Sequence, residues 1–132
     1  MLLVTKWYIK RRITQKYIND LAYKIVGCAI EVHKHSGPGL LESVYERCLI
    51  QELIEQGLKV KSQVCVPIQY KNTVLDYGLK LDMLVENLVI VELKAVEIMI
   101  PVFKAQVLSY LKLADKPKGL LIHFHTEILP VN

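Results

Sequence analysis

Three charged side chains lie close together in a strongly apolar stretch of the chain. Asp82 is followed ten residues later by Glu92, and Lys94 comes two residues after Glu92. Side chains alternate along a strand, so we expect Glu92 and Lys94 on one face and Leu93 on the other. Two carboxylates about 4 Å apart repel by roughly 4 kcal/mol at an effective dielectric near 20. A divalent cation would remove that repulsion, so the spacing predicts a metal site if Asp82 and Glu92 lie side by side.

Two adjacent strands are the elements that must bring these carboxylates together. Residues 89–91 form a continuous apolar run with β-branched side chains, which is typical of a strand buried on both faces. Residues 74–85 fit the strand before it, and this strand carries Asp82. The Glu86-Asn87 link fits a hairpin turn, which would lay Asp82 beside Glu92.

The rest of the chain predicts an α/β fold with two N-terminal helices, a three-strand meander, a further helix and a final strand. An Asn19-Asp20 N-cap precedes the first helix, Gly37-Pro38-Gly39 separates it from the second, and Gly57 should end the second. In chain order, the expected elements are helices over 19–36 and 40–56, strands over 59–70, 74–85 and 88–95, a helix over 102–114 and a strand over 119–125.

Four sequence features in this order resemble a known family. Residues 39–45 fit a Gly-x-x-Glu-x-x-Tyr signature, residues 89–97 read VIVELKAVE, and residues 105–113 read AQVLSYLKL. Together with the spacing from Asp82 to the Glu-x-Lys, they look like the small bacterial and archaeal family named for its GxxExxY motif. That family is grouped with the PD-(D/E)XK nuclease-like superfamily. The resemblance covers roughly residues 19–124 and implies a PD-(D/E)XK nuclease-like core.

The resemblance also implies a role for each residue of the charged cluster. Asp82, Glu92 and the backbone carbonyl of Leu93 would bind Mg²⁺ or Mn²⁺, for which oxygen atoms are suitable ligands. A water on the metal would attack a phosphodiester, and Lys94 would orient that water or stabilise the charge that develops on the phosphate. The alternative for Lys94 is a surface salt bridge with a carboxylate.

Two of the expected helices carry further polar candidates. The resemblance implies that Glu42 joins the metal site and that Gln106 lies near the metal or the scissile phosphate, with Tyr110 on the same helix face. The alternatives are a first-turn Glu42 favoured by the helix dipole and a core Tyr45. Phe103 stands where the resembled family often has a His, which removes a possible acid, base or phosphate contact.

The composition fits one cytoplasmic domain. The chain has 132 residues, of which 52% are hydrophobic and 23% charged. No apolar run approaches the ~18–20 residues that span a bilayer, and the first residues do not resemble a signal peptide. Cys28, Cys48 and Cys65 are widely spaced, so we expect small buried hydrophobes in a reducing compartment, without a disulfide or a zinc site.

The formal net charge of +4 is concentrated at the start of the chain. Residues 1–18 are expected to form a basic arm that could lie along nucleic-acid phosphates, and the alternative is a solvated leader. Residues 19–132 would then form the single PD-(D/E)XK nuclease-like domain. The basic residues of the arm are Lys6, Lys10, Arg11, Arg12 and Lys16.

The histidines form two close pairs with different interpretations. His123 and His125 alternate onto one strand face, but zinc needs further ligands, and no Cys or His has a supporting spacing. His33 and His35 lie at the expected end of the first helix, where the dipole favours them.

Three functions from different classes fit these observations. The first is a metal-dependent nuclease that hydrolyses phosphodiester bonds in DNA or RNA, and a homodimer suits it because nucleases that cut duplexes often need two sites. The second is a non-catalytic nucleic-acid- or partner-binding module that keeps the nuclease fold. The third is an enzyme of nucleotide or phosphate chemistry outside polymers. The presence of Asp82, Glu92 and Lys94 together favours the first.

Overall fold

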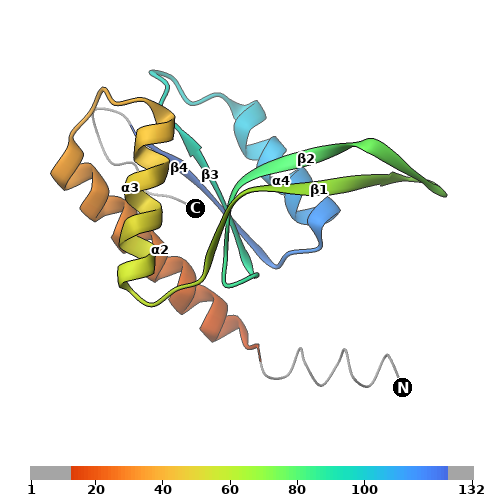
Figure 1. Cartoon of the computed structure of the whole chain (residues 1–132), viewed down its shortest axis with the longest axis horizontal. Helices are drawn as coiled ribbons and strands as arrows, with labels where there is room; N and C mark the ends of the chain where they lie inside the picture. Colours follow the sequence, from red (N-terminus) through yellow and green to blue (C-terminus); the bar gives the residue numbers. More distant parts are fainter. Residues whose placement is uncertain (1–12, 125–132) are drawn as a thin grey trace.

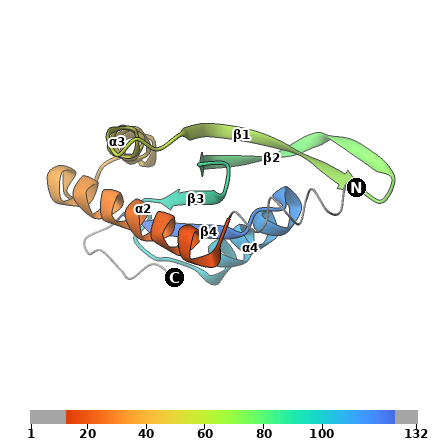
Figure 2. The same ribbon diagram turned by 90° about the horizontal axis from the view of Figure 1, so that it is seen from below.

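One four-stranded sheet is the centre of the structure, and helices cover both of its faces. The computed structural model describes residues 13–124, apart from the side chains of residues 76 and 77. Figures 1 and 2 show α2 and α3 on one side of the sheet and α4 on the other. The elements are α2 (Gln15–Ser36), α3 (Glu42–Glu55), β1 (Val60–Tyr70), β2 (Thr73–Val85), β3 (Val89–Lys94), α4 (Pro101–Ala114) and β4 (Lys118–His123).

The strand order is β1-β2-β3-β4, with antiparallel pairing along the meander and parallel pairing between β3 and β4. Helix α4 provides the crossover that a parallel pair requires. Glu86 and Asn87 both have positive φ angles, 51° and 57°, and the Leu88 N–H donates to the Val85 carbonyl at 3.0 Å. The predicted meander, hairpin turn and crossover are therefore confirmed.

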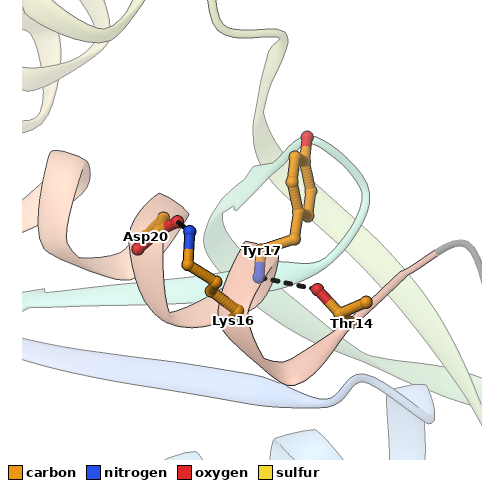
Figure 3. A network of polar contacts seen from close by, with 4 residues as sticks. All are labelled: Thr14, Lys16, Tyr17 and Asp20. Atoms are coloured by element: carbon orange, nitrogen blue, oxygen red, sulfur yellow. Dashed lines mark hydrogen bonds and ion pairs between the residues drawn. The ribbon is translucent and has the colours of Figure 1, made fainter.

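Helix α2 begins earlier than the sequence analysis predicted, so residues 15–18 belong to this helix and not to an arm. The Thr14 hydroxyl accepts a hydrogen bond from the Tyr17 N–H at 3.1 Å, which is an N-cap (Figure 3). The expected cap residues instead form contacts within the helix. Asn19 accepts a hydrogen bond from the Gln15 side chain. Figure 3 shows the pairing of Asp20 with Lys16. Residues 1–12 of the predicted arm lie outside the described part of the chain.

Two clusters of buried side chains fill the two faces of the sheet. The larger joins α2 and α3 to the central strands and includes Ile25, Tyr45 and Val91. The smaller joins α4 to the opposite face around Leu84 and Ile90, which alternate with residues of the larger cluster. Both faces of β3 are thus covered, as its apolar run predicted.

The three cysteines are free, but they are not all buried as predicted. Cys28 is buried and Cys48 is half-buried, whereas Cys65 is exposed. Cys65 lies on β1, which is at the edge of the sheet and has no buried residue, so the prediction of burial was wrong there. Within residues 13–124, no helix is long and apolar enough to cross a membrane.

Gly119 of β4 lies in close contact with α4. A Cβ atom at this position would lie 2.7 Å from the Val107 Cγ1 atom and 3.2 Å from a Leu111 methyl carbon. Gly119→Ala should therefore lower the free energy of unfolding by about 1–3 kcal/mol, as overpacking does. Denaturant unfolding measures this change. The control is Gly27→Ala in α2, where no atom lies within 4 Å and a gain of about 0.4–1 kcal/mol is expected. Equal effects of the two substitutions would contradict the close packing of α4.

Candidate functional site

The paired strands β2 and β3 separate at Asp82 and Glu92. Met83 and Val91 form the last pair of the ladder, and Asp82 and Glu92 are the next residues outward. There the side chains replace the regular ladder bonds. The Leu93 N–H donates to the Asp82 Oδ2 atom at 2.9 Å, and the Asp82 N–H donates to the Glu92 Oε1 atom at 3.1 Å. Each carboxylate therefore fixes the backbone of the other strand, and one oxygen of each is left for the neighbouring carboxyl group or a cation.

The carboxyl group of Glu92 is held in a site that disfavours its charge. Glu92 is only 5% exposed. Burial, with a smaller contribution from the neighbouring Asp82 carboxyl group, raises the pKa of Glu92 to about 8. The Asp82 N–H and the Lys94 ammonium act in the opposite direction but do not compensate. A proton or a cation is therefore needed to neutralise this pair near neutral pH.

Lys94 lies beside the carboxylates without forming a direct ion pair with them. Its Nζ atom lies 4.7 Å from the centre of the Phe103 ring of α4, which is a cation–π contact. The ion pairs within residues 13–124 are Lys16–Asp20 and His35–Glu31, so the salt-bridge alternative for Lys94 is not what the structure shows. Phe103, where the sequence departs from the resembled family, thus holds the ammonium group near the site.

Glu42 approaches the site from the first turn of α3. Burial raises its pKa, the Lys94 ammonium lowers it, and the charges of Asp82 and Glu46 raise it further. Glu42 is thus near enough to interact with the site electrostatically. Among residues 13–124, however, no three His, Cys, Asp or Glu side chains are placed to hold one metal ion together. Direct ligation by Glu42 stays a prediction.

Helix α4 presents Tyr110 and Gln106 to the same side of the sheet. Burial and the charges of Glu92 and Asp82 raise the pKa of the Tyr110 hydroxyl, while a hydrogen bond with the Gln106 side chain lowers it. Tyr110 also packs against the cluster of Leu84 and Ile90. The predicted shared face of Gln106 and Tyr110 is confirmed, and the structure directs it towards the carboxylates.

Tyr45 has a structural role in this site. Its side chain is fully buried, its hydroxyl donates to the Gly37 carbonyl at 2.6 Å, and it accepts from the Leu40 N–H at 3.2 Å. Its ring stacks on Phe124 with 4.4 Å between the ring centres. Tyr45 therefore ties down the loop that precedes α3 and fixes the direction from which Glu42 arrives, which agrees with the core alternative.

The three described histidines each contact a residue other than Asp82 or Glu92. His35 pairs with Glu31 at 3.2 Å, and the His33 ring stacks against Phe124. His123 is buried, and its Nε2 atom forms a hydrogen bond with the Val96 carbonyl. His125 lies outside the described residues, so the zinc alternative with His123 is not tested.

Sequence reasoning missed Gln63, which lies on β1 beside this site. Its side-chain amide donates to both carboxylate oxygens of Glu46 on α3, at 2.9 and 3.1 Å. Gln63 also has a positive φ angle of 51°. A Gln in the middle of an expected strand gives no signal of a left-handed backbone, which Gly or Asn would have given.

One family comparison bears on this geometry. The family model described as the PD-(D/E)XK nuclease superfamily matches residues 19–131 of the chain. No curated protein and no solved structure matches the chain. The match covers the carboxylate pair, Lys94, α3 and α4.

Glu92→Gln should remove the pH dependence of stability that the raised pKa of Glu92 causes. Because the pKa of Glu92 is about 8 in the folded, metal-free protein and near 4.5 when exposed, the folded state holds the proton more tightly. The contribution of the Glu92 proton to stability is therefore fully present below about pH 4.5 and is lost as the pH rises through about 8. At pH 8 the Gln variant should be more stable than the parent by roughly a few kcal/mol. At pH 4.5 the two proteins should have similar free energies of unfolding. Denaturant unfolding in chelator measures both. A parent that gains stability relative to the variant from pH 5 to 8 would contradict this prediction.

Proposed function

We propose that this chain, which belongs to the PD-(D/E)XK nuclease superfamily, is a metal-dependent nuclease that hydrolyses phosphodiester bonds in nucleic acid. The observation that supports this function best is the pair of facing carboxylates at the separation of β2 and β3. A buried carboxylate such as Glu92, with a second carboxylate beside it, is costly unless a proton or a cation neutralises the pair. Within the proposal, the narrower assignment to the GxxExxY family rests on the signature at residues 39–45.

A hard divalent cation fits the donor atoms of the pair. Asp82 and Glu92 each offer one carboxylate oxygen beyond the oxygen used in a backbone hydrogen bond. Mg²⁺ is commonly bound through one or two carboxylates and keeps several waters, so a third protein carboxylate is not required. Asp82, Glu92 and the Leu93 carbonyl would hold Mg²⁺ or Mn²⁺, and Glu42 would bind through a metal-bound water or extend the acidic surroundings. When bound, the cation would supply an acidified water and neutralise charge on phosphate.

The neighbouring side chains would act on the phosphate and the attacking water. The Lys94 ammonium lies over the Phe103 ring and interacts electrostatically with Glu92, and there it can stabilise negative charge that develops on a phosphate. Gln106 and Tyr110 supply an amide and a hydroxyl from α4 on the same side of the sheet. Both are hydrogen-bond donors that suit a phosphate oxygen.

The wider setting of this function also belongs to the proposal. Nucleic acid, DNA or RNA, is the substrate class that a phosphodiester reaction implies. Three free cysteines suit a reducing compartment, which supports a cytoplasmic location. A homodimer would give two sites for the two strands of a duplex.

A second candidate is a non-catalytic module that binds nucleic acid or a protein partner and keeps the nuclease fold. Phe103 favours this candidate, because it occupies the place of a residue that could have served as an acid, a base or a phosphate contact. The cation–π contact also holds the Lys94 ammonium on an apolar ring. Turnover distinguishes the two functions.

Lys94→Ala should abolish cleavage while leaving metal binding intact. We expect the parent to nick supercoiled DNA or degrade single-stranded DNA or RNA slowly with Mg²⁺ or Mn²⁺. Because Lys94 acts on the developing charge and not on the metal, its loss should slow cleavage by about 100-fold or more, with an unchanged Mn²⁺ affinity by calorimetry. Lys104→Ala, at an exposed position of α4, is the control. Binding of these substrates without cleavage, in the parent as in Lys94→Ala, would favour the binding module.

Deletion of residues 1–12 should weaken nucleic-acid binding and flatten its salt dependence. The deletion removes Lys6, Lys10, Arg11 and Arg12 but keeps the Thr14 cap of α2. If all four cations contact phosphates of duplex DNA, the slope of log affinity against log salt should fall by about 3–4. Fluorescence anisotropy at several salt concentrations measures the slope. A full-length variant with the four residues changed to Gln should behave like the deletion, and an unchanged slope in both would contradict a phosphate-binding arm.

A further inference from the structure

The backbone of β1 is irregular at the residue that faces Asp82. Ser62 pairs with Met83 and Val64 pairs with Leu81, whereas the pair between them, Gln63 and Asp82, is missing from the ladder. Gln63 has a φ angle of 51°, in the left-handed region that residues other than Gly rarely adopt. Such conformations persist where the surrounding structure holds them, and they gather at functional sites.

Both strands change the face to which their side chains point at this irregularity. In a regular strand, Leu81 and Met83 would lie on the same face of the sheet. Here Met83 packs with α2 and α3, whereas Leu81 packs with α4. On β1, Val60 and Val64 are divided between the two clusters in the same way. The change of face turns Asp82 out of the β1–β2 ladder, so that its carboxylate can bind the Leu93 N–H on β3.

The Gln63 side chain connects the same point to α3. Its amide nitrogen donates to the Glu46 Oε1 atom at 2.9 Å and to the Oε2 atom at 3.1 Å. Glu46 lies four residues after Glu42 and so on the same face of the helix. The charge of Glu46 acts directly on Glu42. Gln63 thus belongs to the irregular segment of the sheet and contacts the helix that carries Glu42.

We propose that Gln63 is a positioning residue of the carboxylate site. Its left-handed backbone turns Asp82 towards β3, and its amide, through Glu46, sets the start of α3 and thereby the place of Glu42. The part of this inference that concerns metal affinity rests on the proposed function, and the part that concerns the Asp82 and Leu93 hydrogen bonds does not.

Three substitutions separate the backbone role from the side-chain role. Gln63→Val removes the amide and introduces a β-branched residue that disfavours positive φ. Gln63→Gly removes the amide but permits the conformation. Glu46→Ala removes the contact from the helix side and leaves Gln63 in place. The matched control is Cys65→Val, which places the same residue at an exposed, ladder-paired position of β1.

The first measurement is amide hydrogen exchange by NMR in the metal-free protein. Gln63→Val should speed exchange of the Asp82 and Leu93 amides by up to about tenfold, the equivalent of one hydrogen bond, while the Val85 and Val91 amides keep the parent rate. Gln63→Gly and Glu46→Ala should leave all four near the parent rate. A uniform change at all four amides would show a general loss of stability and overturn the proposal.

The second measurement is Mn²⁺ affinity by calorimetry. Gln63→Val should weaken binding by about tenfold or more, with smaller losses in Gln63→Gly and Glu46→Ala and none in the control. Parent affinity and parent exchange rates in Gln63→Val would overturn the inference. A parent protein that binds no Mn²⁺ would refute the proposed function instead, and the exchange rates would still decide the role of Gln63. If Gln63→Val does not fold, a parent-like Mn²⁺ affinity in both Gln63→Gly and Glu46→Ala would overturn the proposed link to α3.

Discussion

The exchange of hydrogen bonds between Asp82 and Glu92 is the interaction on which the rest of the site depends. Each carboxyl group accepts a backbone N–H from the opposite strand, so the two acids stay together although their charged forms repel each other. Backbone N–H groups that would otherwise lack a partner inside the protein stabilise them. The same bonds join β2 and β3 beyond Met83 and Val91, where the regular ladder ends.

The helices around this pair position the polar side chains that lie near it. Helix α4, which carries Phe103, Gln106 and Tyr110, covers one face of the sheet. Its close contact with Gly119 sets its distance from the sheet. On the other face, Tyr45 fixes the loop before α3 and thereby the place of Glu42. The positions of the polar groups are therefore set by packing far from the carboxylates as well as by contacts beside them.

Much of the fold and the centre of the site were predictable because local patterns determine them. The apolar run of β3, the Glu86-Asn87 turn and the Glu-x-Lys spacing are visible in the sequence, and together they place Asp82 beside Glu92. The helix start at Thr14 was missed because Asn19 and Asp20 are good cap residues, whereas the Thr14 cap and the packing of Ile18 extend the helix past them. The exposure of Cys65, the contact of Lys94 with Phe103 and the left-handed Gln63 depend on which elements lie opposite them in space, which periodicity does not show.

The hairpin that joins Asp82 to Glu92 has a consequence for how the protein folds. The two carboxylates meet through the closure of a short loop, whereas Glu42 lies about 40 residues before Asp82 in the chain, at the start of α3. Short loops lose little entropy on closing and form early, so the hairpin can assemble before α2 and α3 dock on it. The growing core then buries Glu92, which already lies beside the half-buried Asp82. We therefore expect the last stage of folding, in which water leaves the pair, to be the stage at which a proton or a cation enters.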